Sequence, residues 1–208
     1  FKADASTDAF YSCHFTILQK VPVYFIDVNN IFAQFREVYK HPQKKYKGAG
    51  KRYYLFSLAA LHFLETLHPE TDIIHLHDYH VGLIAYLLKT RLKISALSKH
   101  AKVVYNIHNL YHQGEWRHNE PKKKKDSGTS PLPLLSRGET AFHDINLAKR
   151  GIMYADSVIT VSRQYAKEII TKKFGCGLER TLLRVHKQGK LKGIINGIDA
   201  THHNPMRD

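Results

Sequence analysis

Residues 71–88, TDIIHLHDYHVGLIAYLL, carry the clearest structural pattern in this sequence. This stretch reads as a buried strand, then a tight polar turn around Asp78, then an apolar helix. A second strand of the same design, 102–107, ends at His108 and Asn109. In an open parallel sheet, ligands bind in the crevice beyond the carboxyl ends of the strands. Two neighbouring strand ends that carry Asp78 and His108 therefore indicate a site at that edge.

The rest of the chain alternates between short apolar strands and helices. Such alternation is typical of βαβ units. We therefore predict an α/β fold, a Rossmann-like parallel sheet with helices on both faces. No GxGxxG or P-loop motif is present. We expect a hairpin of 14–18 and 21–27, strands at 72–77, 102–107, 157–161 and 192–196, and helices at 51–67, 81–91, 142–154, 163–172 and 178–188, the fourth of these helices capped by Ser162.

Composition narrows the class of protein. A chain of 208 residues that is 43% hydrophobic is long enough for one domain with a sizeable core. The longest apolar run, 81–88, is too short to span a bilayer. The two cysteines, Cys13 and Cys176, lack zinc-binding spacing, which indicates a reducing compartment. The chain starts at Phe1 and shows no leader, so we expect a missing N-terminal segment.

The net charge of +14 could indicate nucleic acid, an anionic membrane or a phosphorylated substrate as partner. However, the lysines are spread out, and the one dense block, 122–125, lies in a segment rich in Pro, Gly and Ser, 121–138. We interpret this block as part of a solvated loop. No nucleic-acid-binding motif accompanies it, so we expect neither nucleic acid nor membrane as a partner.

Several polar residues have both a functional and a structural reading. Asp78 could be a functional carboxylate or the N-cap of the following helix. His75, His77 and His80 could bind a metal, but their spacing departs from the HxHxDH pattern of metallohydrolases, and we favour hydrogen-bonded residues of a buried strand. Considered by itself, His108 is best interpreted as a structural histidine. In the same way, Asn196 before Gly197 is best interpreted as part of a turn, and Tyr39 as a packing residue.

Taken together, these segments resemble the bacterial glycogen synthase and plant starch synthase family. DIIHLHDYHVGL is similar to the DIVHxHDWHxGL of that family, and YNIHNLYHQGEW is similar to its TIHNLxYQGxF. INLAKRGIMYADSVITVSRQYAKEI resembles NFLKxGIxYADxVTTVSPxYAxEI, and IINGIDATHHNP resembles LNGIDxxxWNP. The weaker FID and RFxFFSxAAL stretches also match, at 25–27 and 52–60. These motifs follow one another in order from about residue 14 to the C-terminus.

The resemblance implies a GT-B glycosyltransferase that transfers glucose from ADP-glucose, or UDP-glucose in some members, to the non-reducing 4-hydroxyl of an α-1,4-glucan with retention. It implies no metal and no cofactor, and it places the enzyme in the bacterial cytoplasm or the plastid stroma. Asp78 and His108 match active-site residues of the family. Asn196 and Tyr39 match residues of the sugar site, and His80 and Asn109, in the same motifs, are expected to bind substrate there.

The sequence also departs from the family pattern. The 208 residues contain no match to the KxGGL loop or to the second domain, which complete the donor site in the family. Gly48-Ala49 replaces Asp-Asn, Arg163 replaces Pro, and Tyr79 replaces Trp. We expect residues 1–198 to form an acceptor-side N-terminal domain that lacks its first strand, and 199–208 to begin an interdomain linker. We therefore expect little or no activity from this chain alone. The alternatives are an inactive glucan-binding module or gene remnant, a metallohydrolase and a nucleic-acid binder; the oligomeric state stays open.

Overall fold

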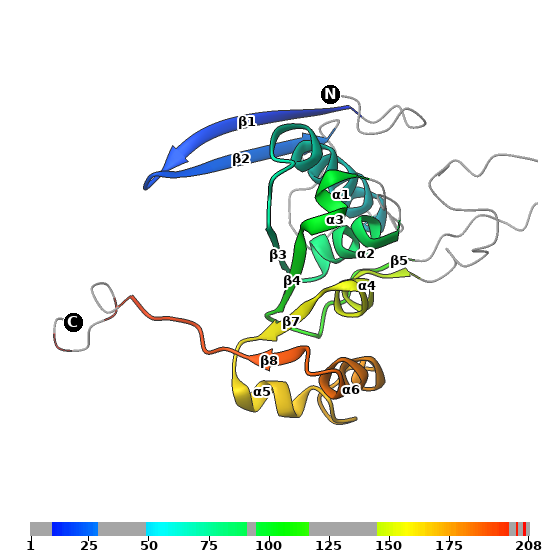
Figure 1. Ribbon diagram of the computed structural model, residues 1–208. Helices are drawn as coiled ribbons and strands as arrows, with labels where there is room; N and C mark the ends of the chain where they lie inside the picture. The colour runs from blue at the N-terminus through cyan, green and yellow to red at the C-terminus, as the bar shows by residue number, and fades with distance from the viewer. Residues whose placement is uncertain are drawn as a thin grey trace, which may run out of the picture.

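A four-stranded parallel sheet forms the centre of the structure (Figure 1). The computed structural model describes residues 10–28, 49–90, 95–116, 145–199, 203 and 206. The strand order is β3-β4-β7-β8, and every neighbouring pair is parallel, which confirms the predicted α/β class. The strands are β3 (Ile73–His77), β4 (Lys102–Ile107), β7 (Ser157–Thr160) and β8 (Leu191–Gly193).

Helices connect the strands and pack against the sheet. α2 (Gly82–Thr90) packs against β3 and β4, and α4 (Leu147–Tyr154) packs against α2 and β4. α6 (Glu179–Lys187) contacts α4 and β8, and α5 (Arg163–Glu168) packs against β7 and β8. The side chains beneath these helices, such as Val103 and Val158, are fully buried. Their burial supplies the main apolar driving force for this core.

The hairpin of β1 (Tyr11–Leu18) and β2 (Val21–Val28) confirms the predicted one. Its two-residue turn, Gln19-Lys20, has φ values of 48° and 69°. Positive φ at both positions is the type I′ geometry that matches the twist of a hairpin. The hairpin packs on α1 (Ala49–Leu67), where the rings of Tyr24 and Phe63 lie 4.8 Å apart.

Among the described residues β3 is the edge strand of the sheet, and its side chains alternate between buried and exposed. Ile74 and Leu76 are buried beneath the helices, whereas His75 and His77 are exposed on the opposite face. The prediction that these histidines belong to a buried strand is therefore wrong. The apolar residues of this strand suggested burial on both faces. Because successive side chains of a strand point to opposite faces, the buried Ile74 and Leu76 cover only one of them.

Several element boundaries differ from the predicted ones. The last strand ends at Gly193 rather than Asn196, although the Ile194 N–H still donates to the Thr160 carbonyl at 2.8 Å. Three short elements were not predicted, because elements of two to five residues show no periodicity. These are α3 (Ala96–His100) and the paired strands β5 (Glu115–Trp116) and β6 (Ile145–Asn146).

Parts of the predicted organisation lie outside the described residues, including the lysine block 122–125 and Gly48. The division at residue 198 stays a prediction. In the part of the chain that the structure describes, no helix is long and apolar enough to cross a membrane.

Gly82 lets α2 approach α4 closely, so we predict that Gly82→Ala destabilises the fold. A Cβ at Gly82 would lie 2.3 Å from the backbone oxygen of Leu147. Alanine normally stabilises a helix relative to glycine, by about 1 kcal/mol. Here we expect a loss of about 1–3 kcal/mol in the free energy of unfolding, because backbone must move. Urea denaturation measures it, with Gly197→Ala, which meets nothing within 4 Å, as the control. A Gly82→Ala protein as stable as the control would contradict this packing.

Asp156 joins β4, β7 and α2 at the amino end of the sheet. Its carboxylate accepts from the Val103 N–H at 2.8 Å and pairs with the Lys89 ammonium at 2.9 Å. Partial burial raises the pKa of Asp156, but the Val103 hydrogen bond and Lys89 outweigh it, and the net pKa is lowered. A lowered folded-state pKa means that this stabilisation is present above the ordinary value and is lost as pH falls through the folded-state value.

We predict that Asp156→Asn lowers the free energy of unfolding by about 1 kcal/mol at neutral pH, after discounting for solvent exposure. The difference between this variant and the unmodified chain should shrink below about pH 4, where the carboxylate begins to take up a proton. Urea denaturation across pH 2–7 measures it. Asp72→Asn is the control. Asp72 is exposed and directly precedes β3, so this substitution should change the free energy of unfolding by less than about 0.5 kcal/mol. A pH-independent difference would contradict the assigned role.

Candidate active site

Asp78 follows β3 directly and has a strained backbone. Its φ of 60° and ψ of −176° fall in a region that is essentially restricted to glycine and costs about 1–3 kcal/mol for other residues. The Asp78 side chain does not cap the short helix η1 (Tyr79–Val81), so the N-cap reading is wrong. Instead, Asp78 Oδ1 accepts a hydrogen bond from the backbone N–H of His108 at 2.8 Å. The Asp78 N–H donates to the Asn106 carbonyl at 2.9 Å.

His108 lies one residue beyond β4, next to Asp78, as the sequence predicted. Its exposed ring stacks on His77, with ring centroids 5.2 Å apart. His108 Nε2 lies 2.9 Å from His77 Nδ1 and 3.1 Å from Asn106 Nδ2. His77 and Asn106 are register partners in the β3–β4 pair, so the sheet itself places both beside this ring. The carboxylate of Asp78 therefore holds the backbone of His108, and His77 and Asn106 hold its side chain.

The outward face of β3 carries a row of imidazoles. The rings of His75 and His77 lie 4.4 Å apart, and His77 leads on to His108. Although His77 is exposed, partial desolvation by its neighbours lowers its pKa, the nearby His75 and His108 lower it further, and Asp78 opposes them. This lowered pKa favours the neutral form of His77 at pH 7. Within the described ranges, no group of three or more His, Cys, Asp or Glu side chains is arranged to hold a metal ion.

His80 lies two residues after Asp78, and Asn109 directly follows His108. The half-buried ring of His80 stacks on Tyr79, with centroids 3.8 Å apart, and meets the ring of Tyr53 of α1 edge-on. Burial lowers the pKa of His80, and Arg52 adds to this effect against the opposing Asp78. Asn109 Oδ1 accepts from the Tyr111 N–H at 2.7 Å, which fixes the turn after β4. His80 thus packs towards α1, whereas Asn109 shapes the loop at the sheet edge.

The structure brings together only part of the predicted site. Thr160 Oγ1 donates to the Ile107 carbonyl at 2.9 Å, which ties the ends of β4 and β7 together. Asn196 is exposed beyond β8, at the same edge of the sheet. Among the described residues, Asn196 makes no hydrogen bond with Asp78 or His108. Tyr39 lies outside the described residues.

Two side chains beside His108 were not predicted as members of the site. Asn106 is buried, with an exposed fraction of 8%, and was read only as part of a strand. The signal that could have identified it is its spacing, because residues two apart on a strand share a face. His77 was considered only as a metal ligand or structural residue, because its pairing with Asn106 requires the register of two strands.

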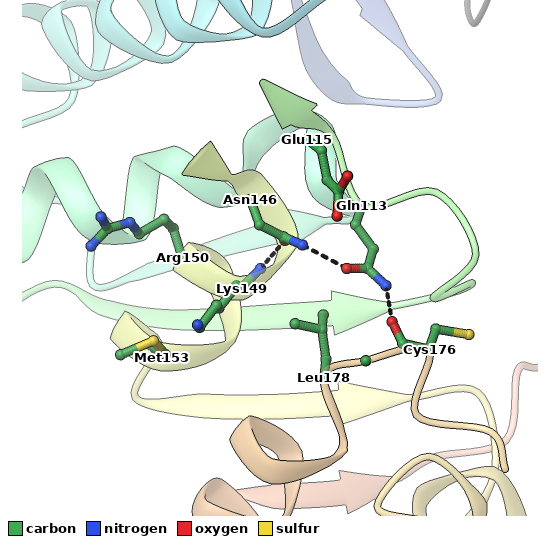
Figure 2. A pocket seen from close by; sticks show the side chains of 9 residues that line it. Gln113, Glu115, Asn146, Lys149, Arg150, Met153, Cys176 and Leu178 are labelled. Carbon is green, nitrogen blue, oxygen red and sulfur yellow. Dashed lines mark hydrogen bonds between the residues drawn. The ribbon is translucent and has the colours of Figure 1, made fainter. Parts of the chain in front are cut away.

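Gln113 is a third residue that sequence reasoning missed, and it joins three segments beside a cavity (Figure 2). Its Nε2 donates to the Cys176 carbonyl at 2.7 Å and the Leu110 carbonyl at 3.1 Å, while its Oε1 accepts from Asn146 Nδ2 at 2.6 Å. The cavity of about 400 Å³ lies beside the start of α4 and contains none of the predicted site residues. It is lined by Gln113, Glu115, Asn146, Lys149, Arg150, Met153, Cys176, Gly177 and Leu178.

A parallel sheet with an aspartate and a histidine joined at neighbouring carboxyl ends defines a Rossmann-like α/β protein with its ligand edge at those ends. Comparison with known proteins narrows this class to one family. The family described as "Starch synthase catalytic domain" matches residues 3–184. The chain therefore belongs to the starch synthase catalytic-domain family.

Curated relatives and a solved structure agree with this assignment. The chain is 36% identical over 193 residues to a glycogen synthase of Streptococcus equi subsp. equi. This alignment covers 92% of the chain and 38% of that protein. The chain is 38% identical over 157 residues to a glycogen synthase of Deinococcus deserti, covering 76% of the chain and 33% of that protein. The chain thus spans little more than a third of the length of these relatives.

The solved structure is the catalytic domain of Starch Synthase IV from Arabidopsis thaliana bound to ADP and acarbose. It superimposes with a TM-score of 0.69 at 27% sequence identity and covers 94% of this chain and 38% of that one. The similarity therefore extends over almost the whole chain and confirms the predicted resemblance.

We predict that Asp78→Gly is more stable than Asp78→Ala by about 1–2 kcal/mol. Both variants lose the hydrogen bond to the His108 N–H, but only glycine adopts the Asp78 backbone angles without steric strain. Glycine elsewhere in a folded chain is usually less stable than alanine, so the order reverses the normal one. Urea denaturation of both variants measures the difference, and equal stability would contradict the strain at Asp78.

Proposed function

We propose that this chain forms the acceptor-side part of a glycogen or starch synthase. The enzyme transfers glucose from ADP-glucose, or UDP-glucose, to the non-reducing 4-hydroxyl of an α-1,4-glucan with retention of configuration. Membership of the starch synthase catalytic-domain family supports this activity. The observation that carries it is the strained Asp78, whose carboxylate is hydrogen-bonded to His108 at the carboxyl edge of the sheet. Strain of this kind clusters at active sites and ligand clamps.

The chemistry of the pair suits glucosyl transfer. The transition state of such a transfer carries positive charge on the sugar ring, which a fixed carboxylate stabilises. Asp78 Oδ1 is engaged by the His108 N–H, and Oδ2 has no hydrogen-bond partner among the described residues, so Oδ2 is the oxygen available to the sugar. The ring of His108 then contacts a hydroxyl of the transferred glucose. His80, Asn109, Asn196 and Tyr39 are proposed to bind the sugars around this pair.

We further propose that transfer requires no metal and no cofactor besides the nucleotide sugar. In the family that the sequence resembles, cationic side chains neutralise the leaving diphosphate. The enzyme would act in the bacterial cytoplasm, or in the plastid stroma if it is plant-like. Full activity after exhaustive EDTA dialysis is the expected result, and activity restored only by a divalent cation would contradict this part of the proposal.

Glucose transfer by the natural gene product tests the proposal. Incorporation of radiolabelled glucose from ADP-glucose or UDP-glucose into glycogen should be readily measured, and Asp78→Asn should lower kcat by about 10²–10³-fold. Asparagine keeps the size of the side chain and an oxygen that can accept from the His108 N–H, so the loss reports the missing charge. His108→Ala should also lower kcat. His100→Ala, an exposed histidine of α3, is the control and should leave kcat unchanged.

Two outcomes would overturn the proposal. A natural product that binds glycogen in co-sedimentation but transfers no glucose from either nucleotide sugar would support the binding-module alternative instead. An Asp78→Asn enzyme that is as active as the unmodified one would separate Asp78 from the chemistry.

A further inference from the structure

Two nitrogen atoms converge on one ring nitrogen of His108. Asn106 Nδ2 lies 3.1 Å from His108 Nε2, and His77 Nδ1 lies 2.9 Å from the same atom. Both distances are those of hydrogen bonds. The hydrogen-bonding roles of these two partners therefore determine which nitrogen of His108 carries the proton.

The Asn106 amide fixes the direction of both bonds. An amide nitrogen only donates, so His108 Nε2 must accept and cannot carry a proton in the neutral ring. The proton of neutral His108 then lies on Nδ1. With Nε2 as an acceptor, the nearby His77 Nδ1 has to donate, so His77 and Asn106 share the one lone pair of His108 Nε2 and the other nitrogen of neutral His77 is unprotonated.

The two donors are held in place by the sheet. Asn106 is 8% exposed and lies within β4, and His77 is its register partner at the end of β3. The His77 ring also lies between the rings of His75 and His108, at centroid distances of 4.4 and 5.2 Å. These contacts restrict rotation of His77. The lowered pKa of His77, caused first by burial, favours the neutral form that this arrangement requires.

We propose that His77 and Asn106 are positioning residues that hold neutral His108 with its proton on Nδ1, so that His108 donates a hydrogen bond from Nδ1 to an oxygen of the bound sugar. The use of that hydrogen bond rests on the proposed glucosyl transfer. The protonation pattern itself does not, because it follows from contacts within the chain. Neither His77 nor Asn106 needs to touch the sugar.

Histidine-labelled NMR of the 208-residue chain tests the pattern directly. Long-range ¹H–¹⁵N spectra at about pH 8, where histidine rings are neutral, distinguish the protonated ring nitrogen from the unprotonated one. His100 provides an internal reference, because its Nδ1 lies 2.9 Å from the Ala96 carbonyl and must carry the proton. We expect His108 to show the same Nδ1–H pattern as His100. A His108 protonated on Nε2 would overturn the proposal without any variant.

Variants then assign the effect to each residue. Asn106→Asp replaces a donor by an acceptor and should move the proton of His108 to Nε2. His77→Ala removes one of the two donors while Asn106 still donates, so His108 should show a smaller share of the Nδ1–H form than in the unmodified chain but a larger share than in Asn106→Asp. His77→Asn, whose amide nitrogen takes the place of His77 Nδ1, should restore the Nδ1–H form. Ile73→Ala is the matched control, since it truncates an exposed side chain on the same face of β3, away from the rings of His77 and His108. In every variant, an unchanged His100 pattern shows that the fold is retained.

The proposal fails if His108 keeps the same pattern in His77→Ala and Asn106→Asp. It also fails if His77→Asn behaves like His77→Ala, because any filling of the site would then be equally effective. These outcomes differ from failure of the proposed function. An Asp78→Asn enzyme with full activity would remove the transferase role and leave the NMR result of His108 standing.

Discussion

The hydrogen bond from the His108 backbone to the Asp78 carboxylate is the constraint on which the site depends. It joins the ends of β3 and β4 across a distance of 2.8 Å, in a turn whose backbone angles disfavour any residue with a side chain. Such a conformation persists only when the surroundings determine it. Here the Asp78 N–H is held by Asn106, and the residues that follow, Tyr79 and Gly82, are packed against the core.

Residues at the ends of β3 and β4 contact different parts of His108. Asp78 fixes its backbone, while His77 and Asn106 contact its ring. Because His77 and Asn106 are paired in the sheet, the position of the ring follows from strand register rather than from a flexible loop. A site built in this way is rigid on one side. Asn196, beyond β8, lies in an exposed segment that these contacts do not hold.

Sequence reasoning predicted the parts of the fold that rest on local pattern. The limits of β4, the hairpin turn at Gln19-Lys20 and the Ser162 cap were all correct, because periodicity, turn length and capping chemistry are local. Asp78 and His108 were placed together because parallel strands end at one edge. The partnership of His77 with Asn106 was missed, since it depends on register. The exposure of His75 was missed as well, because it depends on what covers β3.

The crystal structure of the natural gene product with ADP and a glucan oligosaccharide tests most directly whether Asp78 and His108 form the sugar-transfer site. The predicted result is a glucose residue within hydrogen-bond distance of Asp78 Oδ2 and His108 Nδ1, with His108 Nε2 still bonded to Asn106. A glucan bound only elsewhere, for example in the cavity beside Gln113, with Asp78 and His108 free of sugar, would show that these two residues do not form the sugar-transfer site.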